Sequence, residues 1–310
     1  MFILKRYSVM LINIKNYYKN NLIFRFFFAI YLKNMETEME FNEKSNLPGK
    51  DIDSSIMPVL FVGHGNPMNA IQDNEITHGW QKVSSSIPKP KAILCISAHW
   101  ETNGMFVTAA QNPKTIHDFY GFPKELFEVE YPAPGNPELA SETISMLQPN
   151  IAKPDLKWGL DHGCWSVLRH FYPYADIPIV QLSLDYSKSP AMHYEITKEL
   201  KPLREKGVLI IGSGNLVHNL GLVNWQNEQT YDWAIEANDK IKKKIIDGND
   251  KELISYKELG NDVKLAIPTP EHFLPLLYVL SLKNEQEKIS FFNEKIELGS
   301  ISMTSVRIGN

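Results

Sequence analysis

The sequence predicts an α/β protein in which the strands of one central sheet are separated by helices. Short runs rich in Val, Ile and Leu, bounded by Gly, Pro or polar residues, are typical of strands buried on both faces of a sheet. Longer segments with recognisable helix starts lie between these runs, and this alternation is typical of an α/β sandwich. The composition does not change again after Met57, so we expect a single domain from there onward.

Six segments have the pattern of strands. The runs MPVLFV, AILCIS, IPIVQLSL and VLIIGS predict buried strands at 57–62, 92–97, 177–184 and 208–213. A further strand is expected near 105–110, and the segment SISMTSVRIG at 300–309 is expected to be the last. The chain from about 110 to 137 is rich in aromatic residues and Pro, which predicts a long loop.

Helices are expected between these strands. Asn136 is a typical N-cap and Pro137 suits the first turn, which predicts a helix at 136–148. Thr269 and Pro270 have the same relation at the expected start of the last helix, in PTPEHFLPLLYVLSL. The other expected helices cover 70–86, 164–171, 189–204, 231–247 and 251–257.

Composition and charge exclude some functions. A net charge of −4 gives no basic surface for nucleic acid or for a membrane. The two cysteines, Cys95 in a buried run and Cys164 in an aromatic stretch, are too few for a disulfide framework. A reducing compartment, the cytoplasm, is therefore the expected location.

The beginning of the chain differs from the rest. Residues 1–34 contain basic but no acidic side chains, and their longest apolar stretch, LIFRFFFAIYL, is interrupted by Arg25. It is shorter than the roughly 20 apolar residues that span a membrane. Residues 35–56 are polar and rich in turn formers. We therefore expect residues 1–56 to be an extension outside the fold and residues 57–310 to form the folded domain.

Three of the apolar runs lead to a histidine within a few residues. His64 follows the first run, His99 the second, and His218 the run VLIIGS. The carboxyl ends of parallel strands meet at one edge of an open α/β sheet, where ligands bind. Histidines far apart in the sequence can therefore converge there, which predicts a metal site at this edge.

Each histidine also has a structural interpretation. His64, between Gly63 and Gly65, could be a turn residue, although the two glycines favour close approach of a ligand. His99 alone would fit a core histidine equally well. His162, in LDHGCW, is either an acid/base group oriented by its Asp neighbour or a turn residue.

The remaining histidines are less informative. His218 follows a Gly-Ser-Gly-Asn turn, which leaves phosphate binding as a weak alternative because the Lys and the spacing of a P-loop are missing. His272 is expected in the first turn of the last helix, where the positive end of the helix dipole would stabilise the carboxylate of Glu271. His117 lies among aromatic residues and could line a pocket. Surface or packing roles are expected for three more, His78, His170 and His193.

Local catalytic motifs are absent from the sequence. It contains no Cys-x-x-Cys pair, no His-Glu-x-x-His helix and no Gly-x-Ser-x-Gly elbow. A distributed histidine cluster suits borderline divalent metals such as zinc or iron(II).

Seven motifs together resemble one enzyme family. The segments GHGNPMNAIQDN, SAHW, TIHDFYGFP, YPAPGNP, LDHGCWSVL, GSGNLVHNL and PTPEHFLPLLYVL occur in the order found in extradiol ring-cleavage dioxygenases related to 4,5-DOPA dioxygenase, in the protocatechuate 4,5-dioxygenase superfamily. The resemblance runs from about Met57 to the C-terminus. It implies a single α/β domain with a central mixed sheet and a metal at one edge of the sheet.

The resemblance also implies roles for individual residues. The metal ligands of the family correspond to His64, His99 and His272, with His218 also at the metal as a ligand, an acid/base group or both. His162 corresponds to a second acid/base or substrate-orienting residue. Non-haem iron oxygenases usually bind iron through two histidines and a carboxylate, whereas here the third ligand corresponds to His272. The resident metal is therefore expected to be Zn²⁺ or Fe²⁺, of which Fe²⁺ is required for the dioxygenase reaction.

The implied reaction inserts O₂ into the ring of a small catechol such as DOPA, by 4,5-cleavage, to give a muconic semialdehyde. Candidate pocket walls are the aromatic residues Trp100, Phe119, Tyr120, Phe122 and Trp165, which would fit an ordinary core equally well. Arg169 or a lysine could hold a substrate carboxylate. Two alternatives are a zinc-dependent hydrolase that uses the same histidines and a non-catalytic metal-binding descendant.

Overall fold

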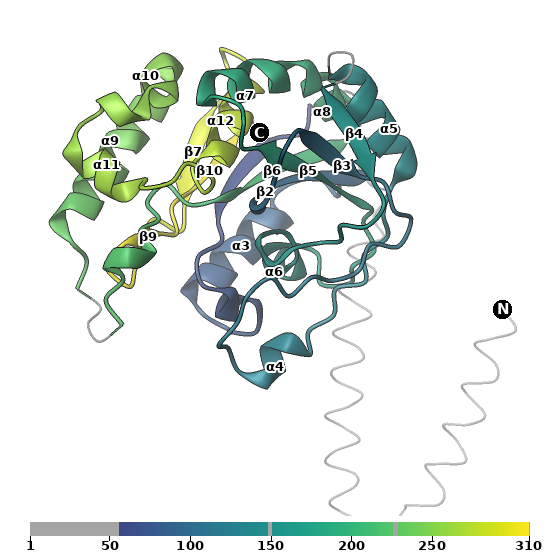
Figure 1. The fold of residues 1–310 in the computed structure, drawn as a ribbon, viewed down its shortest axis with the longest axis horizontal. Helices are drawn as coiled ribbons and strands as arrows, with labels where there is room; N and C mark the ends of the chain where they lie inside the picture. Colours follow the sequence, from purple (N-terminus) through teal and green to yellow (C-terminus); the bar gives the residue numbers. More distant parts are fainter. Residues whose placement is uncertain (1–55, 148–150, 226–228, 310) are drawn as a thin grey trace, which may run out of the picture. The chain divides into compact units, whose positions relative to one another are not determined.

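Eight strands form a mixed sheet that is covered by helices on both faces (Figure 1). The computed structural model describes residues 56–147, 151–225 and 229–309. The predicted fold class, an α/β domain with a central mixed sheet, is confirmed. The extension expected at residues 1–56 lies outside the described residues, apart from Ile56.

The order of the strands places four parallel strands at the centre of the sheet. This order is β4-β3-β5-β2-β6-β1-β10-β7. Strands β5, β2, β6 and β1 are parallel neighbours, whereas β10 pairs antiparallel with β1, and β3 antiparallel with β5. The strands of this sheet are β1 (Val59–Gly63), β2 (Ala92–Thr102), β3 (Met105–Thr108), β4 (Ala152–Asp155), β5 (Ile179–Asp185), β6 (Val208–Gly214), β7 (Ile289–Phe292) and β10 (Ser305–Ile308). A separate hairpin pairs β8 (Ile296–Glu297) with β9 (Ile301–Ser302).

The central strands are buried on both faces, as their apolar runs predict. Successive side chains of a strand point to opposite faces. In β1, Val59 and Phe61 belong to one hydrophobic cluster, whereas Leu60 and Val62 belong to the other. The sheet therefore separates two cores, each closed by its own helices.

Each face of the sheet has its own set of helices (Figure 1). Helices α3 (Glu75–Ser85), α4 (Lys124–Phe127) and α6 (His162–Phe171) contribute to the core beneath one face. The opposite core contains residues of α5 (Pro137–Met146), α7 (Pro190–Thr197), α8 (Pro202–Glu205), α9 (Asp232–Ile246), α10 (Asp250–Ile254), α11 (Asn261–Ala266) and α12 (Leu274–Ser281). Short 3₁₀ helices are η1 (Pro67–Ala70), η2 (Lys198–Leu200), η3 (Leu220–Leu222) and η4 (Tyr256–Glu258).

Proline positions explain two differences from the expected helices. The last helix was expected at Pro270 but begins at Leu274. Pro275 has no N–H to donate to the carbonyl four residues earlier, so residues 270–273 form a turn and the regular helix starts after them. The helix expected at 189–204 is divided in the same way before Pro202.

Side-chain caps and weak strand patterns explain the other differences. The expected helix 70–86 begins only at Glu75, because the side chains of Asn74 and Thr77 form a reciprocal capping box. The helix expected at 164 begins at His162, because Asp161 caps it. The strand expected at 300–309 is two strands, β9 and β10. Strands β4, β7 and β8 were not predicted.

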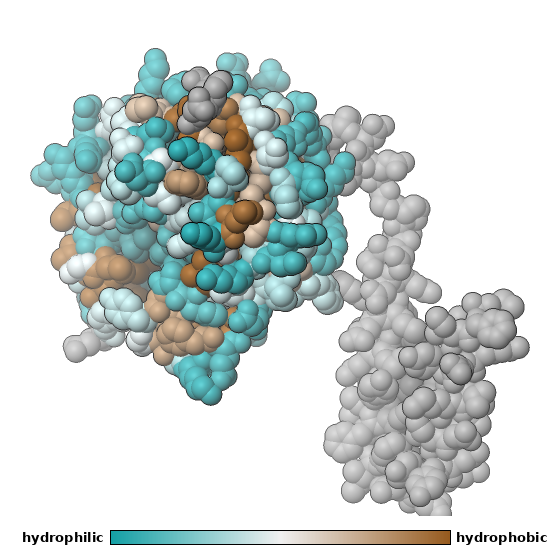
Figure 2. All heavy atoms as spheres, turned by 45° about the vertical axis from the view of Figure 1, so that its right-hand side comes forward, coloured by the Kyte–Doolittle hydropathy of each residue, from teal (hydrophilic) through white to brown (hydrophobic). Residues whose placement is uncertain are grey.

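The surface in Figure 2 is mostly hydrophilic, with hydrophobic areas between the polar side chains. Scattered surface areas of this kind are normal for a globular domain. None of the helices in the described part of the chain is long and apolar enough to cross a membrane.

His193 has a packing role, as expected, and makes the stability of the domain depend on pH. It is buried, and its ring nitrogens lie 2.6 Å from the Tyr278 hydroxyl and 3.2 Å from the carbonyl oxygen of Asp185. Burial lowers the pKa of His193 to about 4.

Below pH 6.5 the unfolded chain protonates this histidine while the folded protein does not, so the free energy of unfolding falls as the pH drops toward 4. His193→Gln is expected to remove about 1–3 kcal/mol of the stability loss between pH 7 and pH 4. Urea unfolding at both pH values measures the difference. An equal loss in the variant and in the original protein would contradict it.

Candidate active site

Five histidines gather at the carboxyl edge of the central strands. His64 directly follows β1, and His218 lies four residues after the end of β6. His99 lies within β2, which continues past it to Thr102, so it does not follow the strand as expected. His162 is the first residue of α6. His272 lies in the turn before α12.

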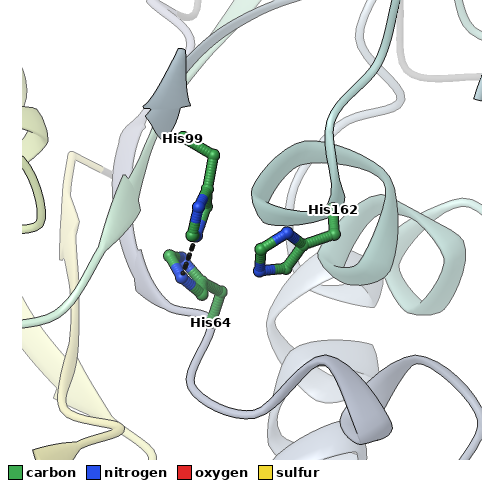
Figure 3. A group of neighbouring side chains, drawn as sticks. All are labelled: His64, His99 and His162. Carbon is green, nitrogen blue, oxygen red and sulfur yellow. Dashed lines mark hydrogen bonds between the residues drawn. The ribbon is translucent and has the colours of Figure 1, made fainter. Parts of the chain in front are cut away.

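The three histidines that the resemblance assigns to a metal form a triangle. The ring centroids of His64 and His99 are 4.9 Å apart, those of His64 and His272 5.3 Å, and those of His99 and His272 5.0 Å. The Nε2 atoms of His64 and His99 are 3.0 Å apart. His162 approaches the same space from α6, and Figure 3 shows its ring turned toward the other two. One ring nitrogen each of His64, His99 and His162 lies within 4.8 Å of the other two, so these three could hold one cation, and His218, Glu271 and His272 form a second group of this kind.

The backbone around His64 explains the two glycines beside it. A Cβ on Gly63 would lie 2.7 Å from the backbone of Met303, which is closer than real Cβ contacts allow. Gly65 has a φ of 59°, in the left-handed region that glycine adopts without strain. These glycines let the chain turn tightly against the segment at Met303 and fix the place where His64 leaves the strand.

A serine in the neighbouring strand determines the tautomer of His64. The Ser213 hydroxyl donates its hydrogen to the carbonyl oxygen of Gly163, at 2.5 Å. Its oxygen also lies 3.0 Å from Nδ1 of His64 and can only accept there. Nδ1 therefore carries the proton, and the lone pair of Nε2 faces Nε2 of His99, 3.0 Å away.

His272 has the same tautomer for a different reason. Its Nδ1 lies 3.0 Å from Oε1 of Glu271, which also accepts the Thr269 hydroxyl at 2.8 Å. A carboxylate only accepts hydrogen bonds, so the proton is on Nδ1. Nε2 of His272 is buried and has no hydrogen-bond partner. A buried nitrogen lone pair without a partner is costly, and a bound cation would satisfy it.

His99 projects from an irregular part of its strand. The pairing of β2 with β5 shifts between Ile96 and Glu101, and bulges of this kind often redirect a side chain next to an active site. The backbone N–H of His99 donates to the hydroxyl of Ser97 at 3.2 Å. Ser97 in turn donates to the buried carboxylate of Asp161 at 2.6 Å. The same Asp161 caps α6, so one carboxylate ties the strand of His99 to the helix of His162.

His218 stacks on His272. Their ring centroids are 3.5 Å apart and the planes are 11° from parallel. The backbone N–H of His218 donates to the carbonyl oxygen of Ala266 at 2.8 Å. Burial, followed by the nearby His272, lowers the pKa of His218 to about 2. Its imidazole is therefore neutral at physiological pH and can bind a metal or accept a proton.

Burial also keeps the three rings of the triangle neutral. It is the largest cause that lowers the pKa of His64, His99 and His272; neighbouring imidazoles lower each pKa further, whereas Glu271 raises that of His272. Only a neutral imidazole has a lone pair for a metal. Three such rings suit a borderline divalent cation such as zinc or iron(II). The donor set therefore fits the metal that the resemblance implies.

Asp118 belongs to the site but was not predicted. Its Oδ2 lies 2.8 Å from Nδ1 of His162 and 3.6 Å from Nδ1 of His99. In the segment HDFYGF, the sequence predicts only aromatic pocket walls and a position for His117 in the lining of a pocket. The ring of His117 instead donates from Nε2 to the carbonyl oxygen of Val129, at 2.9 Å.

Among the aromatic side chains expected to line the pocket, Phe119 contacts the cluster. Its ring centroid lies 5.5 Å from that of His162. Trp165 is buried and donates to the carbonyl oxygen of Ile116, whereas Trp100 stacks on Trp158. Tyr120 is 92 % exposed.

A polar cavity of about 590 Å³ is lined by residues of the segment that follows His64 and of the β8–β9 hairpin, and no histidine is among its lining residues. One wall is the segment that follows His64, which is tied to that residue by the Asn69 amide at 3.4 Å from its carbonyl oxygen. The other wall is the β8–β9 hairpin, where Ile301 pairs with the backbone of His218. The lining residues are Asn66, Asn69, Gln72, Thr230, Lys295, Ile296, Glu297 and Leu298.

The fold and the site define an α/β enzyme with a cluster of neutral imidazoles at the edge of its sheet. Residues 57–309 match the family model of the catalytic LigB subunit of aromatic ring-opening dioxygenase. The chain belongs to this family and is an extradiol aromatic ring-opening dioxygenase. The family implies an aromatic substrate, O₂ and a metal.

Individual relatives agree with this assignment. The chain is 47 % identical over 267 residues to a 4,5-DOPA dioxygenase extradiol of Escherichia coli K12, with 84 % of the chain and 98 % of the relative covered. It is 36 % identical to a protein of that name from Beta vulgaris, with 82 % and 97 % covered. The crystal structure of an uncharacterized Escherichia coli K12 protein matches with a TM-score of 0.72 and 43 % identity, covering 82 % of the chain and all of that structure.

Proposed function

We propose that this enzyme opens the ring of a catechol that carries an amino-acid side chain, such as DOPA, by 4,5-cleavage to a muconic semialdehyde. The observation that carries the proposal is the triangle of His64, His99 and His272, whose centroids lie within 5.3 Å of one another. The names of the relatives support the choice of DOPA.

His64, His99 and His272 would hold the metal, with His218 beside it. A bound Fe²⁺ would supply a binding site for the catechol and the redox change that the reaction with O₂ requires, which Zn²⁺ cannot supply because it has no accessible redox change. His162 and His218 are the acid/base groups. His162 carries its proton on Nδ1, so its Nε2 can accept a proton from a catechol hydroxyl and return it later in the reaction.

Residues around the histidines would position the aromatic ring of the substrate and restrict the access of water to it. Phe119 packs against His162, at 5.5 Å between ring centroids, and offers an apolar surface to an aromatic substrate. His64, His162 and His272 are each less than one-tenth exposed, so the reacting atoms lie in a site largely closed to solvent. In the overall reaction both atoms of O₂ enter the product, and the carbon–carbon bond beside the diol breaks.

The substrate side chain would occupy the polar cavity. Lys295 and Glu297 place opposite charges in its wall, which suits the carboxylate and ammonium groups of an amino acid. Lys295 is free to move, because its side chain is 52 % exposed and its ion pair with Glu75 spans 3.7 Å. Arg169, the other candidate for the carboxylate, lies in the last turn of α6.

Lys295→Ala is therefore expected to raise the KM for DOPA about tenfold or more, the effect of losing a charged hydrogen bond, without changing the KM for 4-methylcatechol. Steady-state O₂ uptake with both substrates measures this. Lys243→Ala, which removes an exposed lysine of α9, is the matched control. Equal KM changes for both substrates would contradict a role in side-chain binding.

O₂ consumption by iron-loaded protein tests the proposed function. After anaerobic loading with Fe²⁺, DOPA is expected to consume one O₂ per molecule and to give a yellow product. No uptake across a panel of catechols, with iron bound and the protein folded, would refute the proposal.

We also propose that residues 57–310 form the catalytic domain, because the family match begins at residue 57. A chain that starts at Met57 is expected to bind metal like the full chain, and loss of its folding would contradict this. Cytoplasmic location is inferred from the buried free thiols of Cys95 and Cys164. Cell fractionation tests it, and recovery from an oxidising compartment would argue against it.

A further inference from the structure

The carboxylate of Asp118 accepts two hydrogen bonds from His162. Its Oδ1 accepts the backbone N–H of His162 at 2.8 Å, and its Oδ2 accepts the ring Nδ1–H at 2.8 Å. Both side chains are mostly buried, with 17 % of Asp118 and 6 % of His162 exposed. The contact from Oδ2 to Nδ1 of His99 is longer, at 3.6 Å, which exceeds a hydrogen bond. The main effect of Asp118 is therefore on His162.

The segment that carries Asp118 is fixed to the start of α6. The backbone N–H of Ile116 donates to the carbonyl oxygen of Leu160 at 2.7 Å. The indole N–H of Trp165 donates to the carbonyl oxygen of Ile116 at 2.8 Å. Ile116, two residues before Asp118, is thus hydrogen-bonded to Leu160, which precedes α6, and to Trp165, which lies within α6. The carboxylate is placed in advance, without a substrate.

We propose that Asp118 is a positioning residue that holds His162 in the Nδ1–H tautomer, so that Nε2 stays free to accept the substrate proton. This inference rests on the ring opening proposed above. A carboxylate has no hydrogen to donate, so the nitrogen facing it must carry the proton. The proton that Nε2 accepts gives an imidazolium, which the negative charge of Asp118 stabilises. The same proton leaves Nε2 when the acid step of the reaction follows.

A purely structural role for Asp118 is the competing explanation. The N–H groups of the first helical turn have no partners within the helix, and Asp118 satisfies that of His162. The variant Asp118→Asn separates the two roles. Its amide oxygen still accepts the backbone N–H, but its NH₂ group then faces Nδ1 of His162 and donates to it. His162 must then carry its proton on Nε2, which removes the acceptor.

In iron-loaded protein, Asp118→Asn is expected to lower kcat for DOPA by about 10²–10⁴-fold, the range for loss of an acid/base group, with iron content and thermal midpoint unchanged. In a His162→Gln background the same substitution is expected to cost less than threefold, because Asp118 acts through His162. The matched control is Asp73→Asn, which changes an exposed aspartate paired with His78. It is expected to leave kcat unaffected.

A ¹⁵N spectrum of histidine-labelled, zinc-loaded protein reads the tautomer directly. His162, assigned by its loss in His162→Gln, is expected to show Nδ1–H in the original protein and Nε2–H in Asp118→Asn. This measurement needs no turnover, so it distinguishes failure of the inference from failure of the proposed function. The inference is overturned if His162 keeps Nδ1–H in the variant, if kcat stays within threefold, if iron is lost, or if the loss is equal in the His162→Gln background.

Discussion

Replacement of His272 by Gln is expected to prevent stable metal binding and to reduce the rate of ring opening by on the order of 10³-fold. This loss exceeds the roughly 10–100-fold loss expected when a residue that hydrogen-bonds to a metal ligand is removed. The reason is the position of its Nε2, which is buried beside His64 and His99 and has no hydrogen-bond partner in the protein. Gln has no nitrogen lone pair to replace it. Metal content by elemental analysis and O₂ uptake with DOPA measure the two effects.

The control for this prediction is another histidine of the same chain. His78→Gln changes a side chain that is 60 % exposed and pairs with Asp73, and it is expected to retain metal and activity. His64→Gln is the second ligand variant and is expected to behave like His272→Gln. Full metal occupancy and normal turnover in a folded His272→Gln protein would show that this ring is not a ligand.

Exchange of iron for zinc is expected to abolish O₂ uptake while catechol binding persists. Zn²⁺ has the same charge and accepts the same imidazole ligands, but it has no second oxidation state. The zinc-loaded enzyme is therefore expected to turn over at less than about 1 % of the iron-loaded rate, a loss above about 2.7 kcal/mol in transition-state stabilisation. Reloading with Fe²⁺ under nitrogen is expected to restore uptake.

This exchange also distinguishes the hydrolase that the sequence left open. A metal-bound hydroxide would make the zinc form the active one toward an amide or ester, and O₂ would be irrelevant. O₂ electrode traces and catechol titrations on metal-assayed samples record both properties. Equal rates for zinc and iron forms, with zinc samples free of iron, would contradict the redox role of the metal.

The strand-end argument predicts where the histidine cluster lies in the fold because it needs little detail. Parallel strands bring their carboxyl ends to one edge whatever the loops do, so His64, His99 and His218 converge there. His272 lies beside them as the motif resemblance implies, although its predicted helix start was wrong. The effect of Pro275 on the turn before α12 outweighed the cap signal at Thr269.

Asp118, Ser213 and Glu271 show why the rest was not predictable. Asp118 meets His162 across 44 positions of the chain, and no local spacing connects them. Ser213 is one residue of a buried strand and reveals its partner, His64, only in the folded sheet. Glu271 was interpreted through the helix dipole, whereas it accepts the Nδ1–H of His272. The edge strands β4 and β7 are short and partly exposed, so their hydrophobic pattern is weak.

The position of the metal is the most direct test of this account. Anomalous diffraction from a crystal of the metal-loaded protein, recorded at the absorption edge of iron or zinc, locates the ion without assuming its ligands. We expect one ion per chain, about 2.0–2.2 Å from a nitrogen of each of His64, His99 and His272. An ion bound elsewhere, or held without one of these three rings, would contradict the account.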